Sequence, residues 1–439
     1  MFSGIVFLFR LLPAFIIIYL LTPQRYRSIS MFFGSLIYYA ALEPHFVWIL
    51  LLLVMLNALL AAPRSRWRML LLVSLDVALL AAAKIRCVTA QGAALPVGIS
   101  FYVFKMISFQ ADLYTGRLEQ KPSFFQTAEY FVMFPQLLQG PIAGYGELYS
   151  GNTHKAGIRE AEEGVALLMT GVCMKVLLAD QLGLMWEQIR RIGYESISTP
   201  LAWLGAYGYS FRLYYDFWGY SLMAAGMLML FGFPYVENFR HPYAARGVAD
   251  FYRRWHITLG RFFRDYVYIP LGGSRNGVAR AVRNLFVVWL LTGLWHGQSI
   301  NFLIWAAVLL ALILWEKFIA YTLLQKFPIL GRLHVWILIP VTWVIFAIHD
   351  PVLLKCYMTR LFPFFGNGIN VNPQDWRKPL EGCGVELAVS VALLVPAVSG
   401  FACRHKDNVI LKLVLFALFW FAIYRVVISS SNPFMYLNF

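Results

Sequence analysis

The stretch that decides the fold runs from Phe251 to Gly297. It begins FYRRWHITLGRFFRDYVYIPLGGSR (251–275) and ends LTGLWHG (291–297). It carries two histidines, His256 and His296, and a dense set of arginines in a chain that is otherwise mostly apolar. We expect the rest of the chain to form a container of apolar helices around these residues.

Arginine is concentrated around the first half of this stretch. Nine arginines, two aspartates and no lysine lie between Arg240 and Arg283. The guanidinium group binds phosphate and carboxylate bidentately, so arginine alone suggests directed contacts to such groups. The alternative is a cytoplasmic loop that meets anionic lipid headgroups.

Apolar residues recur through the same segment at intervals of three and four, and Pro270, Gly272 and Gly273 follow them. This spacing predicts an amphipathic helix lying in the membrane interface. The residues that define it are Phe251, Tyr252, Trp255, Leu259, Phe262, Phe263, Tyr266 and Ile269.

His296 stands at the end of the apolar run NLFVVWLLTGLWHG (284–297). A lone histidine in such a position is more often structural than catalytic. If it is buried, however, it remains neutral, and a neutral imidazole is what a general base needs near pH 7. Position alone therefore leaves both roles open.

Composition indicates an all-α polytopic membrane protein. Of 439 residues, 60% are hydrophobic and 13% charged, and mean hydropathy is +0.64. The apolar runs are continuous, not alternating, which favours helices over a strand barrel because lipid-exposed backbone must bond internally. We expect about eleven spans, at residues 2–22, 28–42, 44–62, 69–83, 163–180, 200–233, 283–295, 299–320, 333–350, 384–402 and 408–428.

Loop charges predict the orientation of these spans. Basic residues follow the first and third spans, whereas little charge separates the second from the third, so the N-terminus is expected outside. Arg404, His405 and Lys406 precede the last span, which places the start of that span inside and the C-terminus outside. Residues Met1–Leu21 lack a basic start and are interpreted as a retained span, not a signal peptide. The segments 145–162 and 351–383 are expected to be polar loops.

Two features within the apolar segments predict internal polar structure. Pro135, Gly140 and Pro141 should break the segment Phe124–Gly144, either as a re-entrant piece lining a cavity or as a kinked span. Arg212 and Asp216 are four residues apart on one helix face and can pair there. That pair is either structural or part of a functional cavity.

The net charge of +15 is explained by basic cytoplasmic loops, so no nucleic-acid partner is expected. The five cysteines are scattered, without a CxxC pair, and imply neither a disulfide framework nor a metal site.

Six segments between residues 95 and 297 resemble the membrane-bound O-acyltransferase (MBOAT) family, in particular its bacterial alginate and peptidoglycan O-acetylation branch. They are LPVGISFYVF, FPQLLQGPI, YYDFWGYSLMAAG, GFPYVENFRHPY, DFYRRWHITLGRFFRDYVYIPLGG and LTGLWHG, and the C-terminal NPFMYLNF matches too. The resemblance implies one MBOAT domain over residues 1–439, with helices around a central tunnel. Its parts are N-terminal spans (1–94), a catalytic core (95–320) and C-terminal spans with a terminal tyrosine motif (321–439).

The resemblance also implies the chemistry and the residues that perform it. Acetyl-CoA from the cytoplasm is the acyl donor, with no permanently bound cofactor, and the acetyl group leaves outward. His296 matches the family's essential histidine, as base, and His256 matches a second histidine that orients the reacting groups. The implied CoA contacts are Arg253, Arg254, Arg264, Trp255 and Trp295, and the implied tunnel residues are Gln139, Asp216 and Arg212.

Tyr436 in the terminal motif occupies the place of a tyrosine that relays the acyl group. The alternative is an aromatic anchor at the membrane surface. The implied partner is an extracytoplasmic SGNH-type acetyltransferase that modifies a polysaccharide (alginate, peptidoglycan, cellulose or similar). The implied location is the bacterial cytoplasmic (inner) membrane, in contact with its lipids.

Two other functions compete with this hypothesis. A transporter or flippase would use the buried charges to line a substrate path, but no inverted repeat is visible. A non-catalytic scaffold would only recruit the secreted acetyltransferase.

Overall fold

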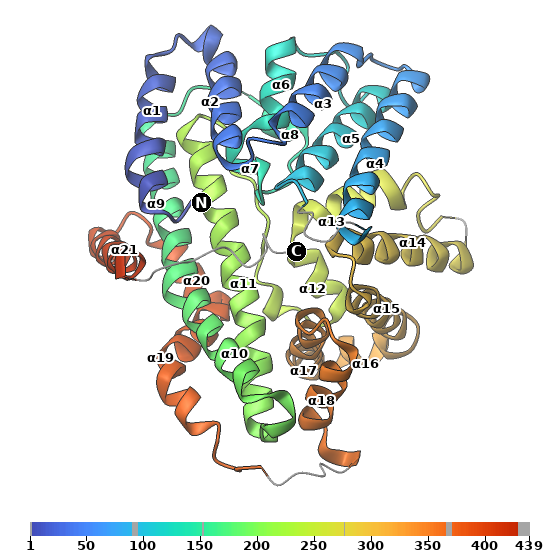
Figure 1. The fold of residues 1–439 in the computed structure, drawn as a ribbon, viewed down its shortest axis with the longest axis vertical. Coiled ribbons are helices and arrows are strands. Elements are labelled where there is room, and N and C mark those ends of the chain that lie inside the picture. The colour runs from blue at the N-terminus through green and yellow to red at the C-terminus, as the bar shows by residue number, and fades with distance from the viewer. Residues whose placement is uncertain (1, 90–94, 152, 276, 366–370, 429–439) are drawn as a thin grey trace.

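The computed structural model describes residues 2–89, 95–151, 153–275, 277–365 and 371–428, and helices are the only regular elements within these ranges. The all-helical prediction is therefore confirmed. Figure 1 shows the N-terminal helices together at the top of the molecule, with α11 passing through its middle.

Five helices open the chain: the first four lie close to the spans predicted there, and the fifth covers most of the apolar segment that starts at Leu95. They are α1 (Leu12–Leu21), α2 (Arg27–Leu42), α3 (Val47–Leu60), α4 (Arg66–Thr89) and α5 (Ile99–Thr115). A segment of short helices follows: α6 (Phe124–Val132), α7 (Phe134–Leu137) and α8 (Tyr145–Leu148).

The predicted break within the segment Phe124–Gly144 is confirmed. The helix α6 starts from a Ser123–Gln126 capping box and stops at Met133, where the backbone turns away from helical angles. Residues 127–143 are all buried. Surrounding helices therefore shield this irregular backbone, as a membrane protein requires.

The centre of the fold is α11 (Thr199–Leu230), which packs against α9 (Ile158–Cys173). Twenty-four of the 32 residues of α11 are buried, so the helix is enclosed on nearly all sides. The helix α9 continues through a π-helical turn (Met174–Ala179) into α10 (Asp180–Ile192). The predicted span 163–180 is thus part of one continuous 35-residue helical segment, Ile158–Ile192, and the predicted span 200–233 corresponds to α11.

Glycines set the distance between α9 and α11. A Cβ on Gly171 would lie 2.4 Å from the carbonyl oxygen of Gly219, and one on Gly226 would lie 2.4 Å from that of Gly164. Because both contacts are to backbone, neither can be relieved by rotating a side chain. This is the close backbone approach that small residues permit between membrane helices.

The arginine-rich segment differs from the single interfacial helix that was predicted. It consists of α12 (Val248–Arg254), α13 (Ile257–Phe263) and a π-helical turn (Arg264–Tyr268), and the helix is broken at Trp255 and His256. Its apolar side chains pack into the protein: Phe251 is fully buried. The spacing of apolar residues correctly predicted helical structure in this segment. The break at Trp255 and His256 depends on tertiary packing, which the spacing does not show.

The remaining helices complete the other side of the molecule. They are α14 (Val278–His296), α15 (Ile300–Trp315), α16 (Tyr321–Lys326), α17 (Pro328–Ala347), α18 (Pro351–Leu361), α19 (Arg377–Leu394), α20 (Pro396–Arg404) and α21 (Val409–Ile428). One prediction is wrong here. The loop predicted over 351–383 contains α18, because Asp350 caps a helix whose first residue is Pro351. The span predicted over 384–402 falls on α19 and α20, which meet at an angle of 76° at a break before Pro396.

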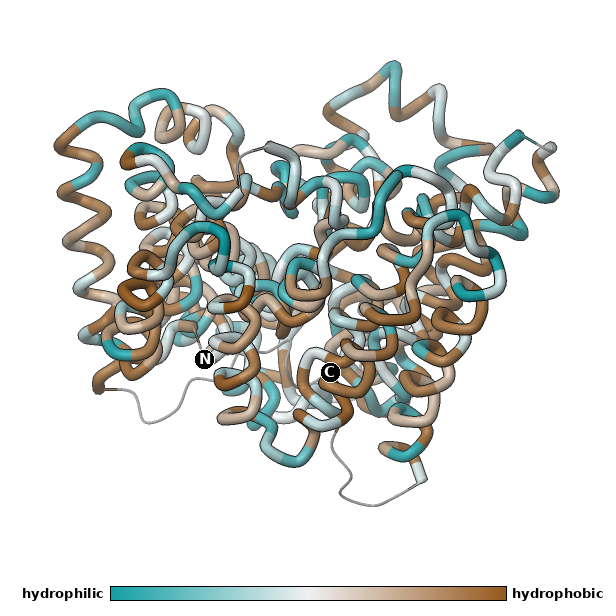
Figure 2. Tube along the Cα trace, turned by 90° about the horizontal axis from the view of Figure 1, so that it is seen from above, coloured by the Kyte–Doolittle hydropathy of each residue, from teal (hydrophilic) through white to brown (hydrophobic). Residues whose placement is uncertain are grey.

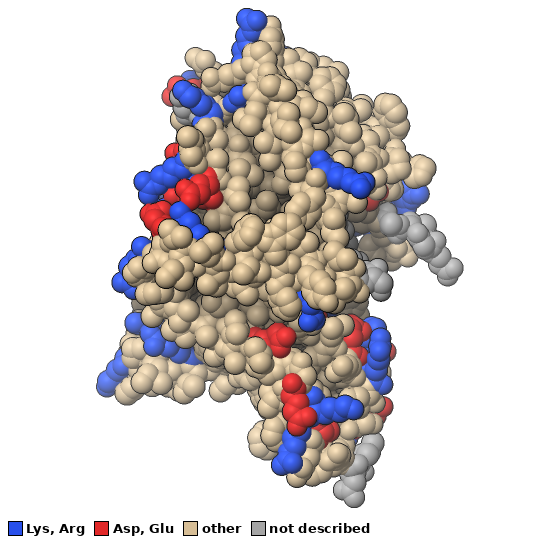
Figure 3. All heavy atoms as spheres, turned by 90° about the vertical axis from the view of Figure 1, so that its left-hand side faces the viewer, with Lys and Arg blue, Asp and Glu red and all other residues tan. Residues whose placement is uncertain are grey.

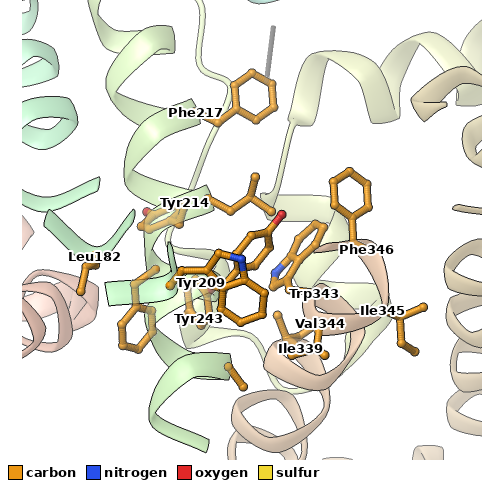
Figure 4. Close-up of a cluster of buried hydrophobic side chains, with 14 of the residues drawn as sticks. Leu182, Tyr209, Tyr214, Phe217, Tyr243, Ile339, Trp343, Val344, Ile345 and Phe346 are labelled. Carbon is orange, nitrogen blue, oxygen red and sulfur yellow. The ribbon is translucent and has the colours of Figure 1, made fainter. Parts of the chain in front are cut away.

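Aromatic side chains join α11 to α17 in the interior. The Tyr243 ring lies between the helices: its centroid is 5.5 Å from that of Tyr214 of α11 and 5.9 Å from that of Trp336 of α17. Figure 4 shows Tyr214, Tyr243 and Trp343 in the same buried cluster. The Tyr243 carbonyl also accepts a hydrogen bond from the Trp336 indole at 3.0 Å.

The surface is that of a multi-pass membrane protein. Five described helices are long and apolar enough to cross a membrane, or six if the bent α19–α20 pair is one span. The predicted count of about eleven is thus not confirmed. Figure 2 shows apolar residues along most helices and hydrophilic ones in many connections, and Figure 3 shows a face with broad uncharged areas between patches of charge.

The glycine contacts generate a stability prediction. Gly171→Ala forces α9 and α11 apart and should destabilise the protein by about 1–3 kcal/mol, the usual cost of overpacking. Thermal unfolding of the purified protein in detergent measures it. Gly400→Ala is the matched control, since it also lies within a helix and a Cβ there meets nothing within 4 Å. Equal midpoints for the two variants would contradict the packing argument.

Candidate functional site

A cavity of about 250 Å³ brings His256 and His296 together. They lie on different elements: His256 joins α12 to α13, and His296 is the last residue of α14. The cavity wall is otherwise almost entirely apolar. Its other lining residues are Tyr252, Trp255, Leu259, Gly260, Phe263, Arg264, Tyr268, Leu285, Val288, Trp289, Thr292, Trp305 and Trp343.

Aromatic rings enclose the His296 imidazole, whose residue is 7% exposed. Trp305 and Phe346 each present a ring centroid 5.1 Å away, both nearly perpendicular to the imidazole. These rings come from α15 and α17, so three helices define the position of His296. An apolar wall of this kind excludes water and strengthens electrostatic interactions within the cavity.

Lys84 anchors the end of α14 that carries His296. The Lys84 ammonium donates a hydrogen bond to the carbonyl oxygen of Trp295 at 2.6 Å, and the Gln298 side chain donates one back to the Lys84 carbonyl at 2.9 Å. A cation at a helix C-terminus satisfies a free carbonyl and the helix dipole together. The helix α4 thereby fixes the backbone on both sides of His296.

His256 has an unusual backbone conformation. Its φ of 46° lies in the left-handed region, which a residue with a Cβ rarely adopts. This turn ends α12 and starts α13, and it places the imidazole in the interior, where the residue is 2% exposed. His256 lies outside the membrane-spanning helices, and burial holds the pKa of its imidazole well below the usual value, so the ring is neutral.

Asn238 holds the His256 ring. The Nδ1 atom of His256 lies 3.1 Å from Oδ1 of Asn238, and the backbone N–H of Ile257 donates to the Asn238 carbonyl at 2.9 Å. The other ring nitrogen, Nε2, is buried and has no hydrogen-bond partner among the described residues.

Glu316 anchors the preceding helix, α12. Its carboxylate accepts hydrogen bonds from the backbone N–H groups of Val248 and Ala249, the latter at 3.0 Å, and pairs with the His334 ring at 2.9 Å. A carboxylate at a helix N-terminus satisfies free donors and the dipole. Glu316 therefore fixes the segment that leads to His256.

The predicted CoA contacts separate into two groups. Trp255 and Arg264 line the cavity, and the Arg264 side chain is 59% exposed, so this arginine stands where the cavity meets the surface. Arg253 and Arg254 are outside the described lining and pair with Asp250 at 3.6 and 3.0 Å. Trp295 is likewise outside it, with its ring centroid 4.5 Å from that of His296.

The Asp216 carboxylate has a different partner from the one that the helical spacing suggested. The Asp216 carboxylate forms an ion pair with Lys175 at 3.2 Å, and Lys175 also pairs with Asp180. The Arg212 side chain instead packs against the backbone at Gly183. Helical spacing allowed the intrahelical pair, but the buried Lys175 on the neighbouring helix competes for the same carboxylate.

Gln139 is 1% exposed, and its amide nitrogen has no partner among the described residues. Neither it nor the rest of the broken segment lines the cavity described above, and the same holds for Arg212 and Asp216. Tyr436 lies outside the described residues.

Three residues that anchor the site were missed in the sequence: Asn238, Lys84 and Glu316. Asn238 falls within the family-like segment GFPYVENFRHPY, which was a usable signal. Lys84 stands close to Arg86 near the end of an apolar helix, and Glu316 follows another, so both look in the sequence like ordinary interface charges. Only their contacts distinguish them.

Comparison with known proteins identifies the class to which this fold and site belong. The family model for MBOAT, the membrane-bound O-acyltransferase family, matches residues 35–359, so the chain belongs to this family and is an O-acyltransferase. The recognition made from the sequence is confirmed.

The relatives belong to the branch that was predicted. The chain is 30% identical over 498 aligned positions to a Pseudomonas putida protein named "Probable alginate O-acetylase", and the match covers 100% of both chains. It is 36% identical over 321 residues to the Pseudomonas fluorescens protein of the same name, covering 70% of this chain and 64% of that one. It is also 35% identical over 242 residues to the peptidoglycan O-acetyltransferase of Helicobacter pylori, covering 48% of this chain and 45% of that one.

Proposed function

We propose that this protein transfers an acetyl group from cytoplasmic acetyl-CoA across the bacterial inner membrane towards an extracytoplasmic polysaccharide. The observation that carries the proposal is that His256 and His296 share one apolar cavity with the exposed Arg264 at its edge. The relatives' names, which refer to alginate and peptidoglycan acetylation, support the class of acceptor.

The proposed reaction is an acyl transfer with a general base. A hydroxyl oxygen attacks the thioester carbonyl carbon while His296 accepts the hydroxyl proton. The C–S bond then breaks, an ester forms, and the CoA sulfur leaves with the proton as a thiol. His256 orients the reacting groups, and the aromatic wall keeps out the water that would hydrolyse the thioester.

Arg264, Arg253 and Arg254 are the proposed contacts to the CoA phosphates. The first stands at the edge of the cavity, and the other two carry partly or largely exposed guanidinium groups in the same segment. Arginine forks suit phosphate oxygens, and the exposed position lets a soluble cofactor reach them.

The proposed acceptor of the acetyl group is the Tyr436 hydroxyl, which relays it to an SGNH-type acetyltransferase outside the membrane. A relay of this kind accounts for how a base inside the membrane serves a polymer that does not enter it. The location in the inner membrane follows from the same division between a cytoplasmic donor and an external acceptor.

His296→Ala tests the reaction. Because His296 is the proposed general base, its removal should lower the rate at which the purified protein releases CoA from acetyl-CoA by about 10²- to 10⁴-fold. The rate is measured with a thiol reagent on purified protein, and the exposed His45→Ala serves as control. If neither the natural protein nor the variant releases CoA, the result favours a transporter. If His296→Ala releases CoA at the natural rate, the proposed role of this residue is refuted.

Arg264→Ala should weaken donor binding. A charge-assisted hydrogen bond contributes about 1.5–3 kcal/mol, so KM for acetyl-CoA should rise at least about tenfold, with a smaller effect on kcat. Steady-state kinetics measure both. Arg190→Ala, an equally exposed arginine on α10, should leave KM unchanged. An unchanged KM for Arg264→Ala would remove this residue from the donor site.

Tyr436→Phe tests the relay. After incubation with acetyl-CoA, mass spectrometry of the C-terminal peptide should show an acetyl adduct in the natural protein and none in the variant. Tyr424→Phe, which changes an exposed tyrosine of α21, should retain the adduct. Undiminished polymer acetylation by Tyr436→Phe in cells would exclude the relay.

A further inference from the structure

The hydrogen-bond network around Asn238 determines which nitrogen of His256 carries the proton. The Oδ1 atom of Asn238 faces three groups: Nδ1 of His256 at 3.1 Å, the Thr258 hydroxyl at 2.9 Å and the Thr258 backbone N–H at 3.3 Å. On the other side, Nδ2 of Asn238 donates to the Ser221 hydroxyl at 3.0 Å.

The amide of Asn238 cannot be turned around in this network. The backbone N–H of Thr258 is always a donor, so the amide atom that faces it must be the acceptor oxygen. The Ser221 hydroxyl accepts from the amide nitrogen in the same orientation. Because Oδ1 can only accept, the His256 nitrogen beside it must be the donor.

We infer that Asn238 is a positioning residue that fixes His256 as its Nδ1–H tautomer and leaves the lone pair on Nε2. The ring is neutral, so it has one proton to place, and Nδ1 holds it. Nε2 is buried, without a hydrogen-bond partner among the described residues, in a side chain that lines the cavity. A buried acceptor without a partner is costly unless a ligand completes it.

This tautomer restricts what His256 does in the proposed reaction, on which this part of the inference rests. Through Nε2 it accepts a hydrogen bond from the hydroxyl as that group binds, which orients the hydroxyl oxygen towards the thioester. The hydroxyl has a single proton, so this bond breaks when His296 takes that proton during the attack. It cannot donate a hydrogen bond to the thioester carbonyl while it is neutral. His256 thus orients the nucleophile and not the electrophile.

The fold explains why the tautomer needs such support. His256 adopts left-handed backbone angles, and Phe217 of α11 packs edge-on to its ring, with centroids 4.6 Å apart. Packing alone fixes the plane of the ring but not the position of its proton. Hydrogen bonds to Ser221 of α11 and Thr258 of α13 hold the Asn238 amide in place, and the amide oxygen then fixes the proton of His256 on Nδ1.

The direct test is solid-state NMR of the full-length protein in lipid bilayers, labelled with ¹⁵N and ¹³C at histidine. The chain has eight histidines, and the His256 signals are those lost in His256→Gln. We expect the nitrogen shifts of a neutral Nδ1–H ring in the natural protein. We expect a shift towards the Nε2–H form in Asn238→Leu, which removes the acceptor at similar volume. An Nε2–H ring in the natural protein overturns the inference, whatever the enzyme's activity.

The functional test measures CoA release from acetyl-CoA by the same variants. Asn238→Leu should lose about 10²-fold or more in kcat, within the range for acid–base groups, whereas KM should change little. Asn238→Asp retains the acceptor for Nδ1–H and should recover most of the rate. Thr258→Val removes one donor to Asn238 but not the His256 bond, so it should lose far less than Asn238→Leu.

The outcomes separate this inference from the proposed function. If the natural protein shows no His296-dependent CoA release, the proposed function fails while the NMR result still decides the tautomer. If release occurs and Asn238→Leu matches the natural rate, the positioning role is wrong. If Thr258→Val loses as much as Asn238→Leu, Asn238 acts by anchoring α13 and the positioning role is again wrong. Thermal unfolding of each variant shows whether it has folded.

Discussion

The close approach of α9 and α11 is the contact on which the rest of this structure depends. Glycines on both helices allow backbone to meet backbone, and the buried Lys175 and Asp216 pair across the same interface at 3.2 Å. A charge inside a membrane protein is tolerated when a partner satisfies it, and here the partner comes from the neighbouring helix. The ion pair is accordingly part of the helix packing, and α11 is held where its aromatic face can meet α17.

The cavity is defined by backbone anchors more than by the residues that line it. Lys84 holds the end of α14, Glu316 holds the start of α12, and Asn238 holds the turn between α12 and α13. Each anchor comes from outside the element that it fixes. The two histidines therefore take their positions from three anchors in separate parts of the chain, and the proposed acyl transfer would need such fixed placement.

An apolar cavity also suits the chemistry of a thioester. Water competes with any other hydroxyl nucleophile, and a wall of indole and phenyl rings leaves it few places to bind. The same wall makes polar groups scarce, so each one has a large effect. A single asparagine that fixes a proton on one side of an imidazole then decides which partner the other side can bind.

The sequence by itself determined that this chain is a helical membrane protein and that the helical segment after Ser123 breaks, and it singled out the two histidines that the structure brings to one cavity. Apolar periodicity, proline and glycine positions and family-like motifs are local signals, and each can be read without knowing what lies nearby. They also located α14 and its terminal His296 closely. They could not show the break of the arginine-rich helix at His256, because a left-handed turn there is stable only when packing and Asn238 enforce it.

Only the tertiary structure decided the partners. The sequence placed Arg212 beside Asp216, yet Lys175 took that carboxylate, since a buried charge pairs with whichever opposite charge the packed helices bring closest. Lys84 lies 211 positions before Trp295, whose carbonyl it holds, and Glu316 lies 68 positions after Val248. Asn238 is nearer, 18 positions before His256, but in a segment outside α12 and α13. No periodicity or composition relates such residues, because contacts between distant segments exist only after the helices have packed.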